Sequence, residues 1–392
     1  MTLSPSPQPL VDTAGQIQPS AQPQPRTGST EDLVGSRRRH GRWGRWWRRW
    51  LGRVFVTGSA LWLVFVFVHL ALSGRVWWWL LAGLLPPITF LAVPLLFAAA
   101  AAGCWRTRRP AALLCTLALI AGAPLAGINL PGPLRPAQPV PSDALRVVAW
   151  NTGYWHPAGA GDDFYHLLRA NRADVYLLQE YIAETDGRIV PIDELDRLRR
   201  ELPGYHVAQV GELVTLSRFP IVGEIALSAD GLPPAPDDFT DFWRYQVLRT
   251  DLQVGDEVLS VYNAHLPVPL WAGGPGLFTG QFHRSIREQH ARRVPQFEAL
   301  ATDVETNDHP VVLAGDLNTT AAMGDIRRLP DGLRDAVTAN RSLYPASWPV
   351  AQTSLWRLDW ALVSPQITVH RHEFSEPAGL SDHRLQSIWV TL

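Results

Sequence analysis

Residues 54–74 form a run of 21 residues without a charged side chain, counting His as neutral. A helix of about 20 apolar residues is long enough to cross the hydrocarbon core of a bilayer. Two further uncharged stretches follow at 76–105 and 111–128, and three prolines interrupt the first of them. We therefore expect about three transmembrane helices within 54–129, with the alternative that the proline-broken stretch is re-entrant rather than spanning.

Charge divides the chain into two unlike parts. Residues 1–109 contain 13 Arg and three acids, giving +10, whereas 110–392 contain 22 Arg and 33 acids, giving −11. Cys104 and Cys115 lie in or beside the apolar stretches, so the C-terminal part has no thiol. This excludes disulfides, a cysteine nucleophile and a cysteine-type zinc site from that part.

The arginines around the apolar stretches predict an orientation. Only Arg75 separates the first stretch from the second, whereas three arginines separate the second from the third: Arg106, Arg108 and Arg109. The positive-inside rule then places the N-terminus in the cytoplasm, and an odd number of crossings places the C-terminal part outside the membrane. A signal peptide that begins near Arg48 is an alternative, disfavoured by the two later apolar stretches.

Composition marks further segments along the chain. Residues 1–36 are rich in Pro, Gln and Ser, which predicts a disordered tail. Residues 37–53 interleave Arg with Trp, which is typical of a juxtamembrane segment on an anionic leaflet; nucleic-acid binding is the competing interpretation. The proline-rich segment 130–142 predicts a semi-rigid linker that leads into a domain at 143–392.

Alternating and continuous apolar runs predict an α/β domain with many strands. The expected strands are 145–151, 174–180, 213–217, 221–227, 244–252, 257–264, 310–315, 357–363, 367–373 and 384–391. The expected helices are 163–171, 191–201 and 281–303. Many strands with few long helices predict two packed β-sheets flanked by helices.

Polar residues close several of these strands. In an α/β fold the ligand-binding groups gather where hydrophobic strands run out into loops, so these residues are expected at one rim. Acids, amides and histidines that converge in this way suit a divalent cation and a phosphate ester.

Seven short motifs in the C-terminal domain resemble, in their order, the endonuclease/exonuclease/phosphatase superfamily. They are LRVVAWN at 145–151, YLLQE at 176–180, LSRFP at 216–220, NAHL at 263–266, LAGDLN at 313–318, LDW at 358–360 and SDH at 381–383. The resemblance implies a four-layer α/β sandwich of two mixed sheets flanked by helices, with the site at one edge. Within the superfamily, the chain is especially similar to bacterial membrane-anchored members. Members of the superfamily act on DNA, RNA, phosphoinositides or sphingomyelin. Gly153 and His265 depart from the abasic-site endonuclease pattern, which weakens a DNA-repair interpretation.

The resemblance implies a metal site built from oxygen ligands. Glu180 is the expected first ligand, Asn151 completes or orients the shell, and Asp382 approaches the metal side. These hard donors suit Mg²⁺ or Mn²⁺. The alternative for Glu180 is a surface glutamate that merely follows a core strand.

The resemblance also suggests the catalytic roles. Asp316 would activate or position water, and Asn318 would hold that water or a phosphate oxygen, although Gly-Asp-x-Asn is also ordinary turn chemistry. Asp359 would orient His383, which acts either as a base or as a cationic phosphate clamp. His265 would donate a proton to the leaving alkoxide or stabilise the charge of the transition state.

Two further residues are expected to contact the substrate phosphate. They are Asn263 and Arg218, with the alternative that Arg218 only supports packing between strands. The loop 267–280, apolar and rich in glycine, is expected to be a lid or to dip into the bilayer.

These observations predict a divalent-metal-dependent phosphoesterase, taken first as an extracytoplasmic nuclease-like phosphodiesterase. The charge of −11 lowers attraction to nucleic acid, but a local basic patch at Arg287, Arg292 and Arg293 could still track a strand. The alternatives are a lipid headgroup phosphodiesterase, similar to sphingomyelinases or phosphoinositide phosphatases, and a catalytically silent binding module. The expected partners are a phosphodiester substrate and the lipid bilayer, and no obligate protein partner is evident.

Overall fold

The computed structural model describes residues 30–136, 139–155, 161–186, 188–270, 276 and 279–392. The chain separates into two compact units, 1–51 and 52–392. The predicted disordered tail lies largely outside the described residues, but its last seven residues are helical, because helix α1 is Thr30–Leu72. The predicted juxtamembrane segment is therefore a continuation of one helix.

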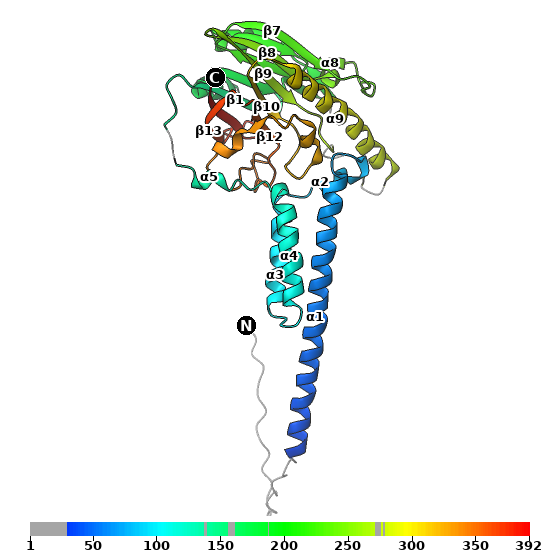
Figure 1. The fold of residues 1–392 in the computed structure, drawn as a ribbon. Coiled ribbons are helices and arrows are strands. Elements are labelled where there is room, and N and C mark those ends of the chain that lie inside the picture. The colour runs from blue at the N-terminus through cyan, green and yellow to red at the C-terminus, as the bar shows by residue number, and fades with distance from the viewer. Residues whose placement is uncertain (1–29, 137–138, 156–160, 187, 271–275, 277–278) are drawn as a thin grey trace, which may run out of the picture. The chain divides into compact units, whose positions relative to one another are not determined.

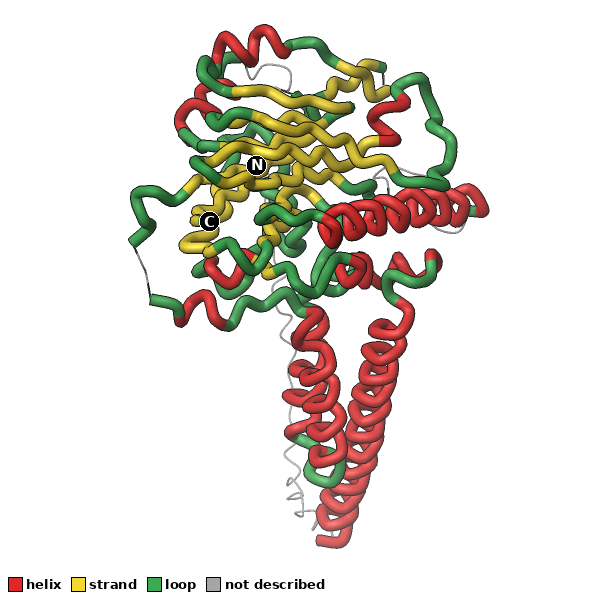
Figure 2. The backbone as a smooth tube through the Cα atoms, turned by 45° about the horizontal axis from the view of Figure 1, so that its top comes forward, coloured by secondary structure: helices red, strands yellow, loops and turns green. Residues whose placement is uncertain are grey.

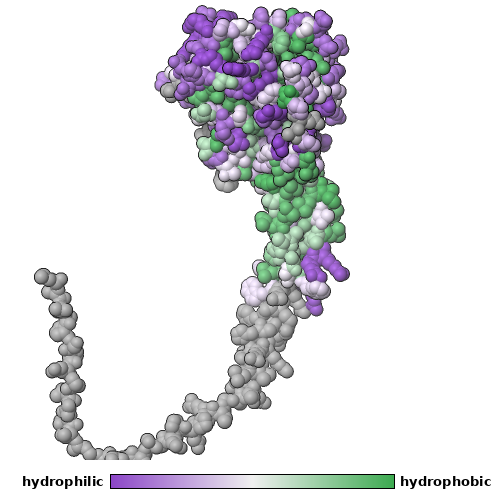
Figure 3. Space-filling view, turned by 90° about the vertical axis from the view of Figure 1, so that its left-hand side faces the viewer, coloured by the Kyte–Doolittle hydropathy of each residue, from purple (hydrophilic) through white to green (hydrophobic). Residues whose placement is uncertain are grey.

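Among the described residues, two helices are long and apolar enough to cross a membrane, namely Trp50–Leu72 and Arg108–Leu125. The second comprises α4 (Arg108–Gly122) and the 3₁₀ turn η2 (Ala123–Leu125). Figure 3 shows the hydrophobic surface of these helices in contrast to the hydrophilic surface of the C-terminal domain. The helices indicate association with a membrane.

The predicted middle span, 76–105, is wrong as a single crossing helix. It is broken into η1 (Trp77–Trp79), α2 (Leu80–Gly83) and α3 (Thr89–Ala102). Pro86 and Pro87 cannot donate backbone hydrogen bonds, so the helix stops before them. With 14 residues, α3 is about 21 Å long, which is shorter than the hydrocarbon core of about 30 Å.

Helices α1 and α4 nevertheless run in the same direction. Gly52 lies against Thr107 at one end, and further along Ser59 Oγ lies 3.3 Å from Cys115 Sγ. Helix α3 runs the opposite way and packs beside α4 (Figure 1). The loop between α3 and α4 therefore lies at the Gly52 end of α1.

The opposite end of α1 is bound directly to the C-terminal domain. His69 Nε2 lies 2.7 Å from the carbonyl oxygen of Ala322, Ser73 Oγ donates to the same oxygen over 3.2 Å, and Gly324 N donates to Ser73 Oγ over 2.9 Å. Trp79 Nε1 donates to His69 Nδ1 over 3.1 Å, so both ring nitrogens of this buried histidine have partners.

The predicted linker does not hold the domain away from the helices. Asn129 Nδ2 reaches the carbonyl oxygens of Val337, Asn340 and Ser342 over 2.9, 2.7 and 3.2 Å. The short helix α5 (Pro131–Leu134) follows at once. The chain is therefore fixed to the domain on both sides of the apolar helices.

The predicted sandwich is confirmed. Among the described residues, one six-stranded sheet has the order β13-β14-β1-β2-β6-β5, a second has the order β11-β12-β10-β9-β8-β7, and β3 and β4 form a small hairpin. The strands are β1 (Leu145–Asn151), β2 (Val175–Gln179), β3 (Ile182–Thr185), β4 (Arg188–Pro191), β5 (His206–Val210), β6 (Leu213–Ser217), β7 (Ile221–Ser228), β8 (Tyr245–Val254), β9 (Glu257–His265), β10 (Val311–Asp316), β11 (Arg334–Asp335), β12 (Asp359–Val363), β13 (Thr368–Ser375) and β14 (Leu385–Thr391).

Three apolar clusters explain the four layers. Val147 and Leu177 of the first sheet pack against Val261 and Val312 of the second, which forms the centre of the sandwich. Helices cover both outer faces, as Figure 2 shows for the long helix α9. The domain helices are α6 (Asp163–Asn171), α7 (Leu195–Glu201), α8 (Thr240–Arg244) and α9 (Gly280–Thr306), with 3₁₀ turns η3 (Gly324–Arg328) and η4 (Ala336–Ala339).

Strand direction brings the polar strand ends to one edge. β1 and β2 are parallel neighbours, and so are β9 and β10, whereas every other neighbouring pair of described strands is antiparallel. The C-terminal ends of these four strands therefore meet the starts of β6, β12 and β14. Asp316 lies opposite both His265 and Asp359 in the register of the second sheet.

Candidate active site

A cavity of about 780 Å³ opens at this edge. Its polar end is formed by seven of the predicted residues, contributed by both sheets: Asn151, Glu180, His265, Asp316, Asn318, Asp382 and His383. Side chains that are up to 232 positions apart in the sequence thus share one cavity. We infer that this cavity is the functional site.

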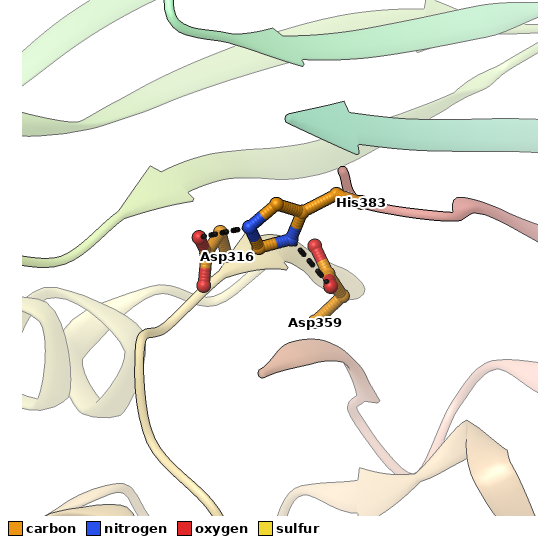
Figure 4. A group of neighbouring side chains, drawn as sticks. All are labelled: Asp316, Asp359 and His383. Atoms are coloured by element: carbon orange, nitrogen blue, oxygen red, sulfur yellow. Dashed lines mark hydrogen bonds and ion pairs between the residues drawn. The ribbon is translucent and has the colours of Figure 1, made fainter. Parts of the chain in front are cut away.

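Asp316 lies at the centre of the polar end and is almost fully buried. On one side His383 points its Nε2 at Asp316 Oδ2 over 3.6 Å, while its Nδ1 lies 3.0 Å from Asp359 Oδ2 (Figure 4). Both ring nitrogens of His383 thus face carboxylates. Asp359 holds the imidazole in the orientation that keeps Nε2 directed into the cavity.

His265 lies on the other side of Asp316 in a matching arrangement. Its Nδ1 lies 2.9 Å from Glu212 Oε1 and its Nε2 lies 3.8 Å from Asp316 Oδ2. Glu212 directly precedes β6 and has no exposed surface. Two carboxylate–histidine pairs therefore flank a single buried aspartate.

The electrostatic surroundings favour the charged form of both histidines. Burial alone lowers the pKa of His265, but Glu212, then Asp316 and Glu180, raise it to about 10. Burial likewise lowers the pKa of His383, and Asp359 followed by Asp316 raises it to about 10. The neighbouring carboxylates thus favour the imidazolium form of both side chains, which can stabilise anionic oxygens or give up a proton.

Asn151 joins the two carboxylates of the predicted metal site. Its Nδ2 donates to Glu180 Oε1 over 3.0 Å and to Asp316 Oδ2 over 3.1 Å. The carboxylates of Glu180 and Asp316, which come from different sheets, thus share one amide as a hydrogen-bond donor. The amide is neutral, so it does not balance the negative charge of these oxygen ligands. This donor set fits Mg²⁺ or Mn²⁺.

A second group could also hold a metal ion, since Asp316, Asp359 and His383 offer ligand atoms within 4.8 Å of one another. We favour a different role for it. Both nitrogens of His383 already face carboxylates, and a metal-bound histidine must be neutral, whereas Asp359 and Asp316 raise the pKa of His383.

Local backbone geometry helps to place these side chains. Gly315 has φ +144°, and a Cβ there would collide with the carbonyl group of Ala264 in β9. Only glycine therefore lets β10 approach β9 just before Asp316. Glu180 and Asn318 have φ +61° and +47°, which is uncommon for residues other than glycine and is frequent at functional sites.

Asn318 and Asp382 lie at the rim of the same cavity. Asn318 N donates to Asp316 Oδ1 over 2.8 Å, and its side chain donates to the carbonyl oxygen of Leu266 over 3.0 Å. Asp382 is exposed, and its Oδ2 accepts a hydrogen bond from Trp348 Nε1 over 2.8 Å. Asn318 therefore fixes Asp316, while Asp382 lies at the mouth.

The structure does not bring the two predicted phosphate contacts to the cavity. Asn263 has no exposed surface, because its Nδ2 donates to the carbonyl oxygens of Leu178 and Val214 and its Oδ1 accepts from Gln179, so it ties the two sheets together. Arg218 lies beside Asp174, which directly precedes β2, and thus at the opposite end of this strand from Glu180. Neither side chain is among the described residues that line the cavity.

Two of the three arginines of the predicted basic patch are engaged within the fold, while Arg287 is exposed. Arg293 is fully buried against Asp325, and Arg292 donates to the carbonyl oxygens of Pro233 and Pro234. Arg287 lies over the ring of Trp77 at 4.9 Å. The predicted lid falls partly on 271–275 and 277–278, which lie outside the described residues.

Sequence reasoning missed Glu212. Glu212 is a single acid directly before an apolar strand. The other site residues were predicted from polar side chains at the ends of strands, whereas Glu212 stands at the start of one. Antiparallel pairing of β6 with β2 brings that start to the active edge.

The fold and the site together define a class of proteins, namely four-layer α/β sandwiches with paired carboxylates and histidines at one sheet edge. The sequence model described as Endonuclease/Exonuclease/phosphatase family matches residues 148–383, more than half of the chain, and the chain belongs to this family. Its members are phosphoesterases that act on substrates such as the phosphodiesters of nucleic acids, and they generally depend on a divalent metal.

Several solved structures are similar to the chain. A family protein from Beutenbergia cavernae is 20% identical with a TM-score of 0.45, covering 64% of this chain and 72% of its own. A mannosyl-6-phosphatase from Bacteroides thetaiotaomicron is 14% identical with a TM-score of 0.44, covering 63% and 100%. Truncated TDP2 from Caenorhabditis elegans is 16% identical with a TM-score of 0.43, covering 64% and 98%. No significant match exists among the curated proteins.

Proposed function

We propose that the protein is a divalent-metal-dependent phosphodiesterase anchored in the membrane by its N-terminal helices. The observation that supports this most directly is the buried Asp316, placed between two imidazolium groups and beside the Asn151–Glu180 pair. This arrangement combines a general base, positive charge and a site for a cation. Hydrolysis of an anionic ester requires all three.

Each residue takes one part in the proposed reaction. Asp316 accepts a proton from water, whose oxygen forms the new bond to phosphorus. His383, oriented by Asp359, acts as a cation toward the nonbridging oxygens rather than as a base, because its pKa is raised. His265 gives its proton to the leaving alkoxide as the ester P–O bond breaks. The products are an alcohol and a phosphate monoester.

Glu180 and Asn151 would hold the metal, with Asp382 as a further ligand at the mouth. A bound Mg²⁺ or Mn²⁺ would neutralise charge on the nonbridging oxygens. The donors are oxygens, so a soft metal that prefers thiolate would bind poorly here.

We propose that the protein crosses the membrane several times and that its catalytic domain lies outside the cytoplasm. Arg53, Arg106, Arg108 and Arg109 stand at the Gly52–Thr107 end of the helices, whereas His69 and Ser73 bind the domain at the other end. Helices α1 and α4 point in the same direction, and the broken segment η1–α2–α3 returns the chain between them, which supports an odd number of traverses. The positive-inside rule then assigns the arginine end to the cytoplasm.

The test uses the full-length protein in detergent with bis-p-nitrophenyl phosphate. We expect hydrolysis with Mg²⁺ or Mn²⁺, its loss with EDTA, and recovery when the metal is restored. Glu180→Gln should lower turnover by about 10²-fold or more, while Glu224→Gln on the exposed face of β7 serves as the control. Hydrolysis that persists in EDTA would refute metal dependence.

A further inference from the structure

One wall of the catalytic cavity is apolar and comes in part from the membrane-proximal segment of the chain. Leu84, which lies between α2 and α3, lines the cavity together with Leu270, Met323 and Trp356. The polar end with Asp316 and His383 belongs to the same cavity. A single molecule bound there therefore meets both a phosphoester site and a hydrocarbon-like surface.

This wall is fixed to the domain by specific contacts. Trp356 Nε1 donates to the carbonyl oxygen of Leu84 over 3.1 Å. The side chain of Met323 packs on Gly83, where a Cβ would lie 3.1 Å from the Met323 Cγ. Met323 stands between Ala322 and Gly324, the two residues that bind the end of α1. The apolar wall and the end of the first membrane helix are thus one connected structure.

The same segment carries the residues expected at the surface of a bilayer. Trp77, Trp78 and Trp79 follow the apolar span Trp50–Leu72 at once, and about half of the surface of Trp78 is exposed. Indole side chains concentrate at the level of the lipid headgroups. Leu84 follows five residues after Trp79, so this wall of the cavity is close along the chain to the residues expected at the membrane surface.

The charge of the domain argues against a polyanionic substrate. Residues 110–392 carry −11, and Arg292 and Arg293 of the predicted basic patch are engaged within the fold. Binding of nucleic acid depends on neutralising many phosphates with basic side chains. The sugar–phosphate backbone of a nucleic acid also has no acyl chain to pack on the apolar wall. A phospholipid, in contrast, carries one phosphodiester attached to acyl chains.

We propose that the substrate is a phospholipid drawn from the bilayer in which the protein is anchored. Its phosphodiester lies at Asp316 and His383, and the first part of its acyl chains lies along Leu84, Met323 and Trp356. The proposal rests on the proposed phosphodiesterase function and adds the class of substrate and the direction from which it arrives. The membrane helices then position the cavity as well as anchoring the domain.

The experiment uses the full-length protein reconstituted into phosphatidylglycerol–phosphatidylethanolamine vesicles with Mg²⁺. Phospholipid hydrolysis is followed by mass spectrometry, and soluble bis-p-nitrophenyl phosphate and plasmid DNA are assayed in parallel. We compare the wild type with Leu84→Glu and with Leu84→Gln, the milder change in case the first does not fold. Val222→Glu, at an exposed position of β7, is the matched control.

We expect the wild type to hydrolyse vesicle phospholipid in preference to DNA. Either Leu84 variant should lower the ratio of phospholipid to soluble-diester turnover at least tenfold, and Val222→Glu should leave this ratio unchanged. Hydrolysis of the soluble diester or of DNA without hydrolysis of phospholipid would overturn the lipid proposal and leave the proposed function intact. Failure on all three substrates would remove both.

Discussion

The two histidines that flank Asp316 owe their charge to buried carboxylates. His265 and His383 are both almost fully buried, and burial by itself would favour neutral rings. Glu212 and Asp359 reverse this, because an adjacent negative charge in a medium of low polarity favours imidazolium strongly. The protein therefore uses one carboxylate behind each ring to keep a proton available at neutral pH.

Glu212→Gln should reveal this dependence for His265. The substitution keeps the size of the side chain but removes its charge, so the pKa of His265 falls from about 10. The proton is then lost at lower pH, and the alkaline limb of the pH–turnover profile should move to lower pH. We also expect kcat to fall by about 10²-fold.

The measurement is the pH dependence of kcat with bis-p-nitrophenyl phosphate in the presence of metal. Asp196→Asn is a suitable control, because Asp196 is exposed on α7 and pairs only with the exposed Arg199 among the described residues. An unchanged alkaline limb in Glu212→Gln would show that His265 does not supply the leaving-group proton.

At the scale of elements, the sequence predicts the pattern of strands well. All ten predicted strands are present, because each contains a run of β-branched, leucine or aromatic residues, and several of them end in a polar residue, as in Val311–Asp316. The edge strands β5 and β11 and the hairpin of β3 and β4 were missed. They bury few side chains or are very short, so their local pattern is weak.

Site residues at the ends of strands were predictable where a strand-end acid or histidine had a motif around it. Asn263 and Arg218 also belong to motifs, but their roles depend on which way the side chains face across the sandwich. Glu212 depends on the antiparallel pairing of β6 with β2, a nonlocal contact that no local pattern encodes. The same holds for Leu84, which reaches the cavity only through the docking of the membrane segment.

Gly315→Ala tests whether the close approach of β10 to β9 requires a residue without a side chain at position 315. An added Cβ would collide with the Ala264 carbonyl, at a φ of +144° that other residues avoid. We expect the free energy of unfolding to fall by at least about 2 kcal/mol. Guanidinium unfolding of the detergent-solubilised protein, followed by tryptophan fluorescence, measures this change.

Gly332→Ala provides the comparison, because a Cβ at Gly332 would meet no atom within 4 Å. Its free energy of unfolding should change by no more than about 0.5 kcal/mol. Equal effects of the two substitutions would mean that loss of chain flexibility, and not the close approach of β9 to β10, explains the cost at Gly315.

At the scale of the whole molecule, the decisive question is the side of the membrane on which the proposed phosphodiesterase site lies. Cys104 offers a natural probe, because it lies between α3 and α4, at the Gly52–Thr107 end of the helices, and is partly exposed. Cys115 is buried and should not react. Glu224→Cys adds a second thiol on the exposed face of β7, within the catalytic domain.

In intact spheroplasts a membrane-impermeant maleimide should label the Glu224→Cys thiol but not Cys104. Detergent permeabilisation should then expose Cys104, and Cys104→Ser should abolish this second signal. The reason is that the proposed orientation places the arginine-rich end of the helices in the cytoplasm, while the domain is bound to their opposite end through His69 and Ser73. Labelling of Cys104 in intact spheroplasts, with the domain thiol protected, would place the catalytic cavity in the cytoplasm and its phospholipid substrate in the inner leaflet.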